Sequence, residues 1–372
     1  MEKSSWAISK PGTTSIVNQS RFFPVFSKTR GERKSTLEHI HRRHRFSEMK
    51  ENKHSTVRKW ENMPYDILLK IFMTLNIVDM VSGISGVCSS WRSACCDPVL
   101  WKTLDLSQLK SDYINIPSEP YAWSDDRSSE KLMQILKNAL SLSRGNVTCL
   151  IFHFYIYIKD EHLIYTAERC PGLKRLVLPA WTKVTVEGFR KAVQMCKGLE
   201  SMTVPCISSP SRIMEAISTN CKNFCELKIM CPFDMEFATA ITTRLPKLKV
   251  LSLRCSMLFK EALVHILNYL EHLEVLNISH CLLLDIPQSP APSRVFRELD
   301  ASILEKASRL REFLTCQENS CTMCQYTIND EGILRWHIYE EGLWRMDEEI
   351  SFPRQVMPPA PAERCHRGVW KH

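Results

Sequence analysis

The sequence is poor in glycine and lacks the motifs of the common enzyme classes. Only 11 of its 372 residues are glycine, about half of the usual share, which argues against an all-β protein built on tight glycine turns. No phosphate-binding loop, dinucleotide-binding fingerprint, G-x-S-x-G elbow, HExxH pair or kinase catalytic loop occurs. We therefore expect a protein that is not an enzyme and that uses no cofactor.

Long apolar runs are also missing. No run approaches the roughly 18 apolar residues that suggest a transmembrane helix, so we expect no membrane partner. Residues Met1–Lys10 are polar and do not predict a secretory signal peptide. The 16 cysteines are therefore interpreted as reduced side chains of a protein of the nucleus or cytoplasm, most of them acting as small buried hydrophobes.

The positive charge is confined to the beginning of the chain. Residues 1–59 hold 14 Lys and Arg against 5 Asp and Glu, which leaves a net charge of −1 for residues 60–372. This distribution argues against nucleic acid as a partner of the folded part. We expect residues 1–59 to be a basic, disordered extension. Its run His39–Arg45 has two interpretations, a nuclear import signal and a solvated tail, and an organelle transit peptide is a third.

Residues 60–106 are dense in apolar residues. Pro64 suits the first turn of a helix, and a broad apolar face follows at helical spacing, formed by Ile67, Leu68, Ile71, Phe72 and Leu75. Two further short helices and a strand at Thr103–Leu106 are expected. Three short helices bury little surface by themselves, so we expect part of this apolar surface to contact a partner.

Residues 129–292 contain a repeat. After a helical segment and a degenerate copy at Val147, gap-free copies begin 26, 25, 24 and 25 residues apart, at Cys170, Cys196, Cys221, Leu245 and Leu270. The L-x-x-L-x-L pattern at this period is typical of leucine-rich repeats. In each copy the alternating apolar residues predict a short strand facing the core, followed by a helix. Because the three cysteines share the phase of Leu245 and Leu270, they are interpreted as buried hydrophobes.

The remaining segments are predicted from their turn residues and periodicity. Residues 107–128 are expected to form a connecting loop. Residues 293–350 are expected to hold a capping helix at 293–316 and a hairpin at 333–346, and residues 351–372 a disordered tail. Cys316, Cys321 and Cys324 could form part of a zinc site with His337. Thiols without a metal are the simpler interpretation, and we expect no metal.

The order Met63-Pro64, Ile67-Leu68, Ile71-Phe72, Leu75, Asp79, Val87-Cys88, Trp91-Arg92, Asp97-Pro98 and Leu100-Trp101 resembles an F-box. With the repeats, the chain resembles plant F-box/LRR-repeat proteins. The resemblance implies an α/β fold in which a three-helix F-box precedes a short solenoid of alternating strands and helices. It also implies the substrate receptor of an SCF-type ubiquitin ligase, bound through an SKP-type adaptor to a cullin. The residues that it assigns to the adaptor interface are Met63, Pro64, Leu68, Ile71, Val87, Cys88 and Trp91.

The target protein would then bind the solenoid. Outward strand positions and strand ends give the candidate contact residues Arg175, Trp181, Lys228, Arg254, Asn277 and His280. For most of them individually, a merely solvated side chain is the simpler interpretation. An alternative function is a scaffold tethered to the adaptor without turnover of a target.

Overall fold

The structure is a computed structural model, and it describes residues 60–109, 126–153, 156, 158–178, 183–204, 207–285, 294–296, 298–317, 320, 321, 324, 325 and 327. All of these belong to one compact unit, residues 58–372. Several predictions lie outside the described residues: the extension 1–59 with its basic run, most of the loop 107–128, Trp181, His337, the hairpin 333–346 and the tail 351–372. None of the described helices is both long and apolar enough to span a bilayer.

The first part of the unit consists of three short helices, as predicted. They are α1 (Tyr65–Phe72), α2 (Ile77–Ser82) and α3 (Ser89–Cys95), interspersed with the 3-10 turns η2 (Trp60–Asn62), η3 (Ile84–Gly86) and η4 (Pro98–Leu100). The Asn76 side chain caps α2 by accepting a hydrogen bond from the Asp79 backbone N–H, 2.9 Å away. Asp97 caps η4 in the same way through Val99.

Alternating strands and helices follow, which confirms the predicted α/β architecture. The elements are β1 (Thr103–Asp105), η5 (Leu106–Gln108), α4 (Asp126–Ser143), β2 (Cys149–Ile151), α5 (Asp160–Arg169), β3 (Arg175–Val177), α6 (Val186–Met195), β4 (Ser201–Val204), α7 (Pro210–Asn220), β5 (Glu226–Ile229), α8 (Met235–Arg244), β6 (Val250–Ser252), β7 (Met257–Phe259), α9 (Lys260–Tyr269), β8 (Val275–Asn277), β9 (Leu282–Asp285), β10 (Arg294–Phe296), α10 (Ala301–Ala307) and β11 (Glu312–Leu314). Helix α4 begins within the segment predicted as a loop.

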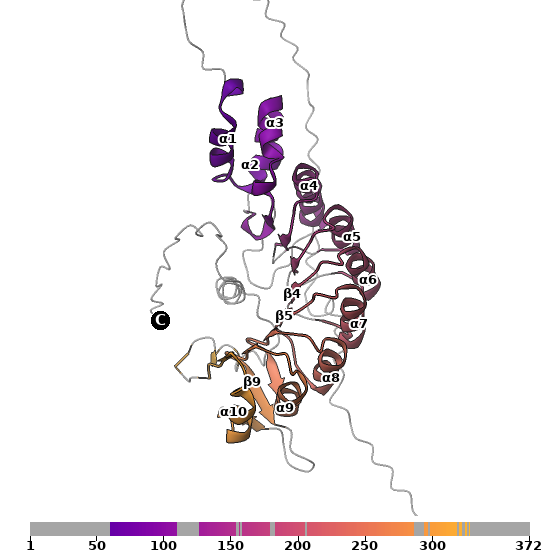
Figure 1. The fold of residues 1–372 in the computed structure, drawn as a ribbon, viewed down its shortest axis with the longest axis vertical. Helices are drawn as coiled ribbons and strands as arrows, with labels where there is room; N and C mark the ends of the chain where they lie inside the picture. The colour runs from indigo at the N-terminus through magenta and orange to yellow at the C-terminus, as the bar shows by residue number, and fades with distance from the viewer. Residues whose placement is uncertain are drawn as a thin grey trace, which may run out of the picture. The chain divides into compact units, whose positions relative to one another are not determined.

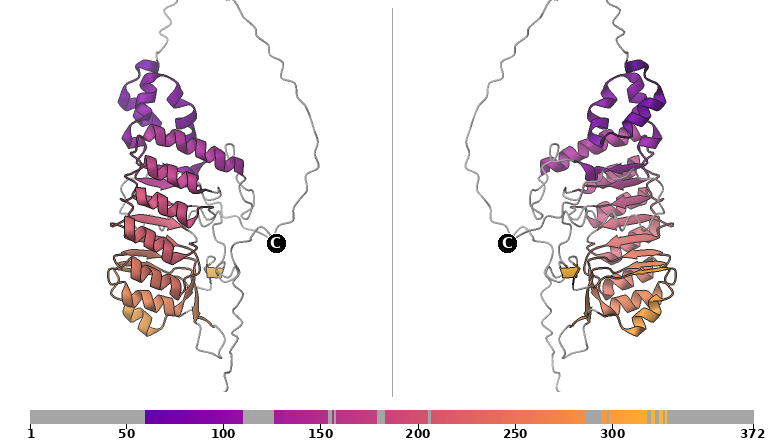
Figure 2. Two further views of the ribbon diagram at one scale, coloured as in Figure 1. Left: turned by 90° about the vertical axis from the view of Figure 1, so that its right-hand side faces the viewer. Right: turned by 90° about the vertical axis from the view of Figure 1, so that its left-hand side faces the viewer.

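One parallel sheet runs through the whole array. Its strand order is β1-β2-β3-β4-β5-β6-β8-β11, and helices α4 to α9 lie in sequence order along one side of it (Figures 1 and 2). Strands β7, β9 and β10 form a second, smaller sheet. The central residue of each array strand pairs in register with the next, as Leu176 does with Met202 and Leu227 with Leu251, so these side chains form one continuous row in the core.

The three repeat cysteines are buried hydrophobes, as the sequence phase predicts. Cys170, Cys196 and Cys221 end helices α5, α6 and α7, where Leu245 and Leu270 end α8 and α9. Burial raises the pKa of their thiols to about 12, 12 and 11, respectively. Thiols of such high pKa are poor nucleophiles. No disulfide bond joins any cysteine of the described residues.

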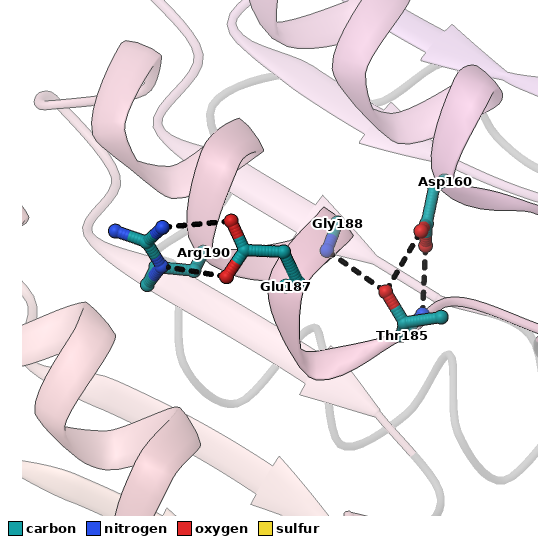
Figure 3. A network of polar contacts seen from close by, with 5 residues as sticks. All are labelled: Asp160, Thr185, Glu187, Gly188 and Arg190. Carbon is teal, nitrogen blue, oxygen red and sulfur yellow. Dashed lines mark hydrogen bonds and ion pairs between the residues drawn. The ribbon is translucent and has the colours of Figure 1, made fainter.

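Side-chain caps fix the starts of α6 and α8, and the contacts at the start of α6 also reach α5 (Figure 3). Thr185 caps α6 by accepting a hydrogen bond from the Gly188 N–H at 2.9 Å. The Thr185 N–H and Oγ1 in turn donate to the two carboxylate oxygens of Asp160, the first residue of α5, each over 2.7 Å. Glu187 turns away from this group and pairs with Arg190. The repeats of α5 and α6 are therefore joined at their helix N-termini as well as in the sheet.

The prediction of one helix over residues 293–316 is wrong. This segment contains β10, α10 and β11, and β11 pairs in parallel with β8, so it extends the sheet of the array beyond residue 292. Helix α10 ends at Ala307, and Arg309 then donates hydrogen bonds to the carbonyls of Leu267 and Leu270 at the end of α9. The chain turns there and adds a final strand instead of continuing as a helix.

Candidate functional site

Helix α1 carries two adjacent apolar stripes, only one of which is covered. Leu68 and Phe72 are 1% and 2% exposed in the core, whereas Ile67 and Ile71 are 42% and 39% exposed. Each pair has i,i+4 spacing, so each forms its own line along the helix. The apolar surface of α1 thus exceeds what the fold buries.

Other exposed apolar side chains gather in the same short segment. Most of the large hydrophobic side chains that are exposed in the described residues belong to residues 60–99, namely Trp60, Tyr65, Ile67, Ile71, Met73, Val87 and Val99. A concentration of this kind in a segment of this length is typical of a protein–protein contact surface.

The framework beneath these side chains is held by specific contacts. The Trp91 Nε1–H donates to the carbonyl of Trp60 over 3.1 Å, and its ring meets that of Phe72 edge-on at 5.6 Å between centroids. The Tyr65 hydroxyl donates to the carboxylate of Asp97 over 2.8 Å, and this hydrogen bond raises the pKa of Tyr65. The starts of α1 and α3 are thereby tied to the turns beside them.

The seven predicted adaptor-binding residues fall into three groups. Pro64, Ile71 and Val87 are exposed and available for contact. Met63, Cys88 and Trp91 are half-buried, and Leu68 is buried. Leu68 therefore supports the surface from the core. The role of all seven in adaptor binding stays a prediction.

Five exposed side chains were missing from the predicted set: Trp60, Tyr65, Ile67, Met73 and Val99. Ile67 carried a readable signal, because an i,i+4 apolar pair beside a second such pair makes a helix more apolar than one core contact requires. The exposure of Trp60 and Val99 depends on how η2 and η4 turn, which no periodicity reveals.

On the array, the predicted target-binding residues that the structure describes lie in strands of the sheet or just beyond their ends. Lys228 pairs in register with Thr203 and Ser252, and its ammonium forms an ion pair with Glu226 over 3.1 Å. Lys228, Arg254 and Asn277 are only 4%, 7% and 5% exposed, and Arg175 and His280 are half-buried. Their role in target contact stays a prediction.

Three of the four predicted metal-ligand candidates come together. Cys316, Cys321 and Cys324 lie with a histidine, and all four ligand atoms are within 4.8 Å of one another. The histidine is His280, which the sequence placed on the target-binding face, and the predicted ligand His337 lies outside the described residues.

The fold and the exposed apolar side chains together define a small helical domain suited to docking, followed by a repeat array. Comparison with known proteins identifies the same two parts. The F-box-like family matches residues 60–107. The F-box/LRR-repeat protein At3g48880 of Arabidopsis thaliana is 50% identical over 297 residues, covering 79% of this chain and 96% of that protein. The chain therefore belongs to the F-box/LRR-repeat proteins.

More distant relatives from the same plant agree. The F-box protein FBW2 is 25% identical over 301 residues, covering 77% of this chain and 87% of its own. The F-box protein SKIP1 is 28% identical over 170 residues, 45% of this chain and 54% of its own. An adaptor-binding role for the F-box follows from this membership.

Proposed function

We propose that this protein is a non-catalytic substrate receptor of an SCF-type ubiquitin ligase. Its F-box binds an SKP-type adaptor, which connects it to a cullin, and its repeat array binds the target protein. The observation that carries the proposal is the uncovered apolar stripe Ile67–Ile71, together with exposed Val87, on a domain that belongs to the F-box-like family.

Hydrophobic contact supplies the affinity for the adaptor in this proposal. Ile71 and Val87 each leave a large part of their side chain in water, and burying such a side chain contributes about 1.5–3 kcal/mol when it is fully covered. Leu68, Phe72 and Trp91 hold the exposed side chains in place from below. The half-buried Cys88 lies next to Val87 in the chain and immediately precedes α3.

Proximity is the chemistry that such a receptor supplies. A target held by the array is presented to the ubiquitin-conjugating enzyme at a high effective concentration, and no side chain of the receptor needs to form or break a bond.

Adaptor binding is tested with variants of exposed residues, which leave the core intact. We expect Ile71→Asp and Val87→Asp to weaken binding of a purified SKP-type adaptor at least about tenfold, because each removes apolar contact and buries a charge. Binding is measured by calorimetry on the full chain. Leu304→Asp is the matched control, since Leu304 is 49% exposed but lies on α10. The proposal fails if the full-length wild type does not bind the adaptor, or if both F-box variants bind it as the control does.

A second experiment separates a receptor from a scaffold tethered to the adaptor without turnover. Proteins labelled by proximity to the chain are compared between the wild type and Val87→Asp, with and without proteasome inhibition. A receptor predicts at least one array-bound protein that accumulates on inhibition with the wild type and whose ubiquitination is lost with Val87→Asp. Array-bound proteins whose levels and ubiquitination are the same in both cases would identify a tether.

A further inference from the structure

The ends of the last two strands of the parallel sheet bring four potential metal ligands together. His280 follows β8, and Cys316 follows the neighbouring strand β11. The His280 N–H donates to the Cys316 carbonyl over 2.8 Å, so the backbone itself fixes the spacing of these two residues. The chain beyond β11 returns Cys321 and Cys324 to the same place.

Three of the six distances between the ligand atoms are close to those of a tetrahedral zinc site, and all six are within 4.8 Å. With Zn–S bonds of about 2.3 Å and Zn–N bonds of about 2.0–2.1 Å, sulfur atoms in a tetrahedron lie about 3.8 Å apart and a sulfur and a nitrogen about 3.5–3.6 Å apart. Here the Sγ atoms of Cys316 and Cys324 are 3.8 Å apart. The His280 Nδ1 lies 3.3 Å from the Cys324 Sγ and 3.5 Å from the Cys321 Sγ.

We propose that His280, Cys316, Cys321 and Cys324 bind one structural Zn²⁺ ion in a Cys3His site. Three thiolates and an imidazole are soft and borderline ligands that suit zinc and not magnesium or calcium. Four protein ligands close the coordination sphere, so the site has no open position for a water or a substrate. Its role is therefore structural, and it is independent of the function proposed above.

The sequence around the ligands supports this assignment. Cys321 and Cys324 have the C-x-x-C spacing with which two cysteines bind one zinc ion, and Cys316 precedes them by five residues. His280 adopts a left-handed backbone conformation with φ of 60°, which is uncommon outside glycine. In this conformation its side chain reaches the three cysteines.

The charges around the site are compatible with a bound ion. Three thiolates packed within 4.8 Å of one another need a cation to compensate their charge. A zinc ion with three thiolates and a neutral imidazole has a net charge of −1. An imidazole coordinates a metal ion in its neutral form. The Arg254 guanidinium also offsets the remaining negative charge.

The ion would fasten the C-terminal end of the array. Repeat arrays require a cap on their last repeat because its core is otherwise open on one side. Coordination would join residues 316–324 to the end of β8 and would contribute to folding, as structural zinc sites generally do.

The test uses the full-length chain, purified with a reductant and without added chelator, and elemental analysis by mass spectrometry. We expect about one zinc per chain for the wild type and loss of that zinc from Cys321→Ser and His280→Asn. Asparagine tolerates the left-handed backbone of residue 280, so the second variant removes the imidazole with little strain. Cys225→Ser is the matched control, a half-buried cysteine outside the group, and it should retain the zinc.

A measurement on the wild type alone tests the proposal even if the variants do not fold. Chain produced with Co²⁺ should show the visible bands of tetrahedral cobalt and thiolate charge transfer, and Zn²⁺ should displace them. The proposal is overturned if the wild type holds no zinc after refolding with Zn²⁺, if both ligand variants retain zinc as the control does, or if alkylation mapping finds a disulfide among the three cysteines instead.

Discussion

At the scale of single residues, the contact between α5 and α6 depends on the missing side chain of Gly188. A Cβ atom at this position would overlap the carboxylate of Asp160, far inside any van der Waals contact. The carboxylate is held there by its two hydrogen bonds from Thr185. Glycine is therefore required at a helical position where alanine has the higher helix propensity.

We expect Gly188→Ala to lower the free energy of unfolding by about 1–2 kcal/mol, because the overlap outweighs the roughly 1 kcal/mol that alanine contributes to a helix. Urea unfolding followed by circular dichroism measures the change. Gly172→Ala is the control, since nothing lies within 4 Å of its added Cβ. In an Asp160→Ala background the cost of Gly188→Ala should shrink. A stabilising effect of Gly188→Ala in the otherwise unchanged chain would refute this explanation.

The burial of the repeat cysteines could be predicted from the sequence, whereas the full cluster of cysteines and histidine at the end of the array could not. Cys170, Cys196 and Cys221 repeat with the period of the array, so their burial follows from phase alone. The group at the end of the array has no such signal for its histidine, because His280 lies 36 residues before Cys316 in the chain. Only the parallel pairing of β8 with β11 brings the two together, whereas the sequence alone favours His337, which is nearer in the chain.

At the scale of elements, the array was predictable because each strand and helix obeys one local pattern. The F-box helices were predictable from Pro64 and the i,i+4 apolar spacing. The last repeat was not predictable, because it breaks the period of about 25 residues. Ala307 is equivalent to Leu270, and Phe313 to Leu276, at a separation of 37 residues in both cases. The extra residues of this repeat include β9 and β10, and the apolar residues from Phe296 onward recur at a spacing that resembles a helical face.

Arg309 links this last repeat to the preceding helix α9, and the contribution of this link to stability can be measured. Its guanidinium donates to the carbonyls of Leu267 and Leu270, both over 2.9 Å, and so satisfies the end of α9. We expect Arg309→Ala to destabilise the protein by roughly 2 kcal/mol, because it removes two partly buried hydrogen bonds from a charged donor, although the residue as a whole is exposed.

Arg311→Ala is the matched comparison for Arg309→Ala. Arg311 is 59% exposed and pairs with Glu274 over 2.8 Å, and an exposed pair of this kind contributes at most about 1 kcal/mol. Thermal unfolding of both variants in one buffer gives the comparison. Equal effects would mean that the carbonyls at the end of α9 are satisfied equally well by water.

At the scale of the whole described unit, the F-box and the array are not separate bodies joined by a linker. Strand β1, which directly follows the F-box helices, pairs with β2 and so forms the first strand of the array sheet. Helix α2 packs against α4, and one hydrophobic core extends from Leu68 in the F-box to Leu310 after α10. The F-box, with its exposed apolar side chains, is thus packed directly against the first repeats.

This connection predicts how a defect at the junction spreads. Leu104 lies in the middle of β1 and is 1% exposed, and Leu276 holds the equivalent position in β8 at 0%. Replacing either by alanine should lower the free energy of unfolding by about 2–5 kcal/mol.

The two replacements should differ in where the structure loosens. Because each repeat of a solenoid contacts chiefly its neighbours, Leu104→Ala should speed backbone hydrogen exchange in the F-box helices and also in α4 and β2. Leu276→Ala should speed it in α9 and β8 and leave the F-box unchanged. Hydrogen exchange measured by mass spectrometry on peptides from each element distinguishes the two variants. If Leu104→Ala sped exchange in the F-box helices alone, strand β1 would not couple the F-box to the array.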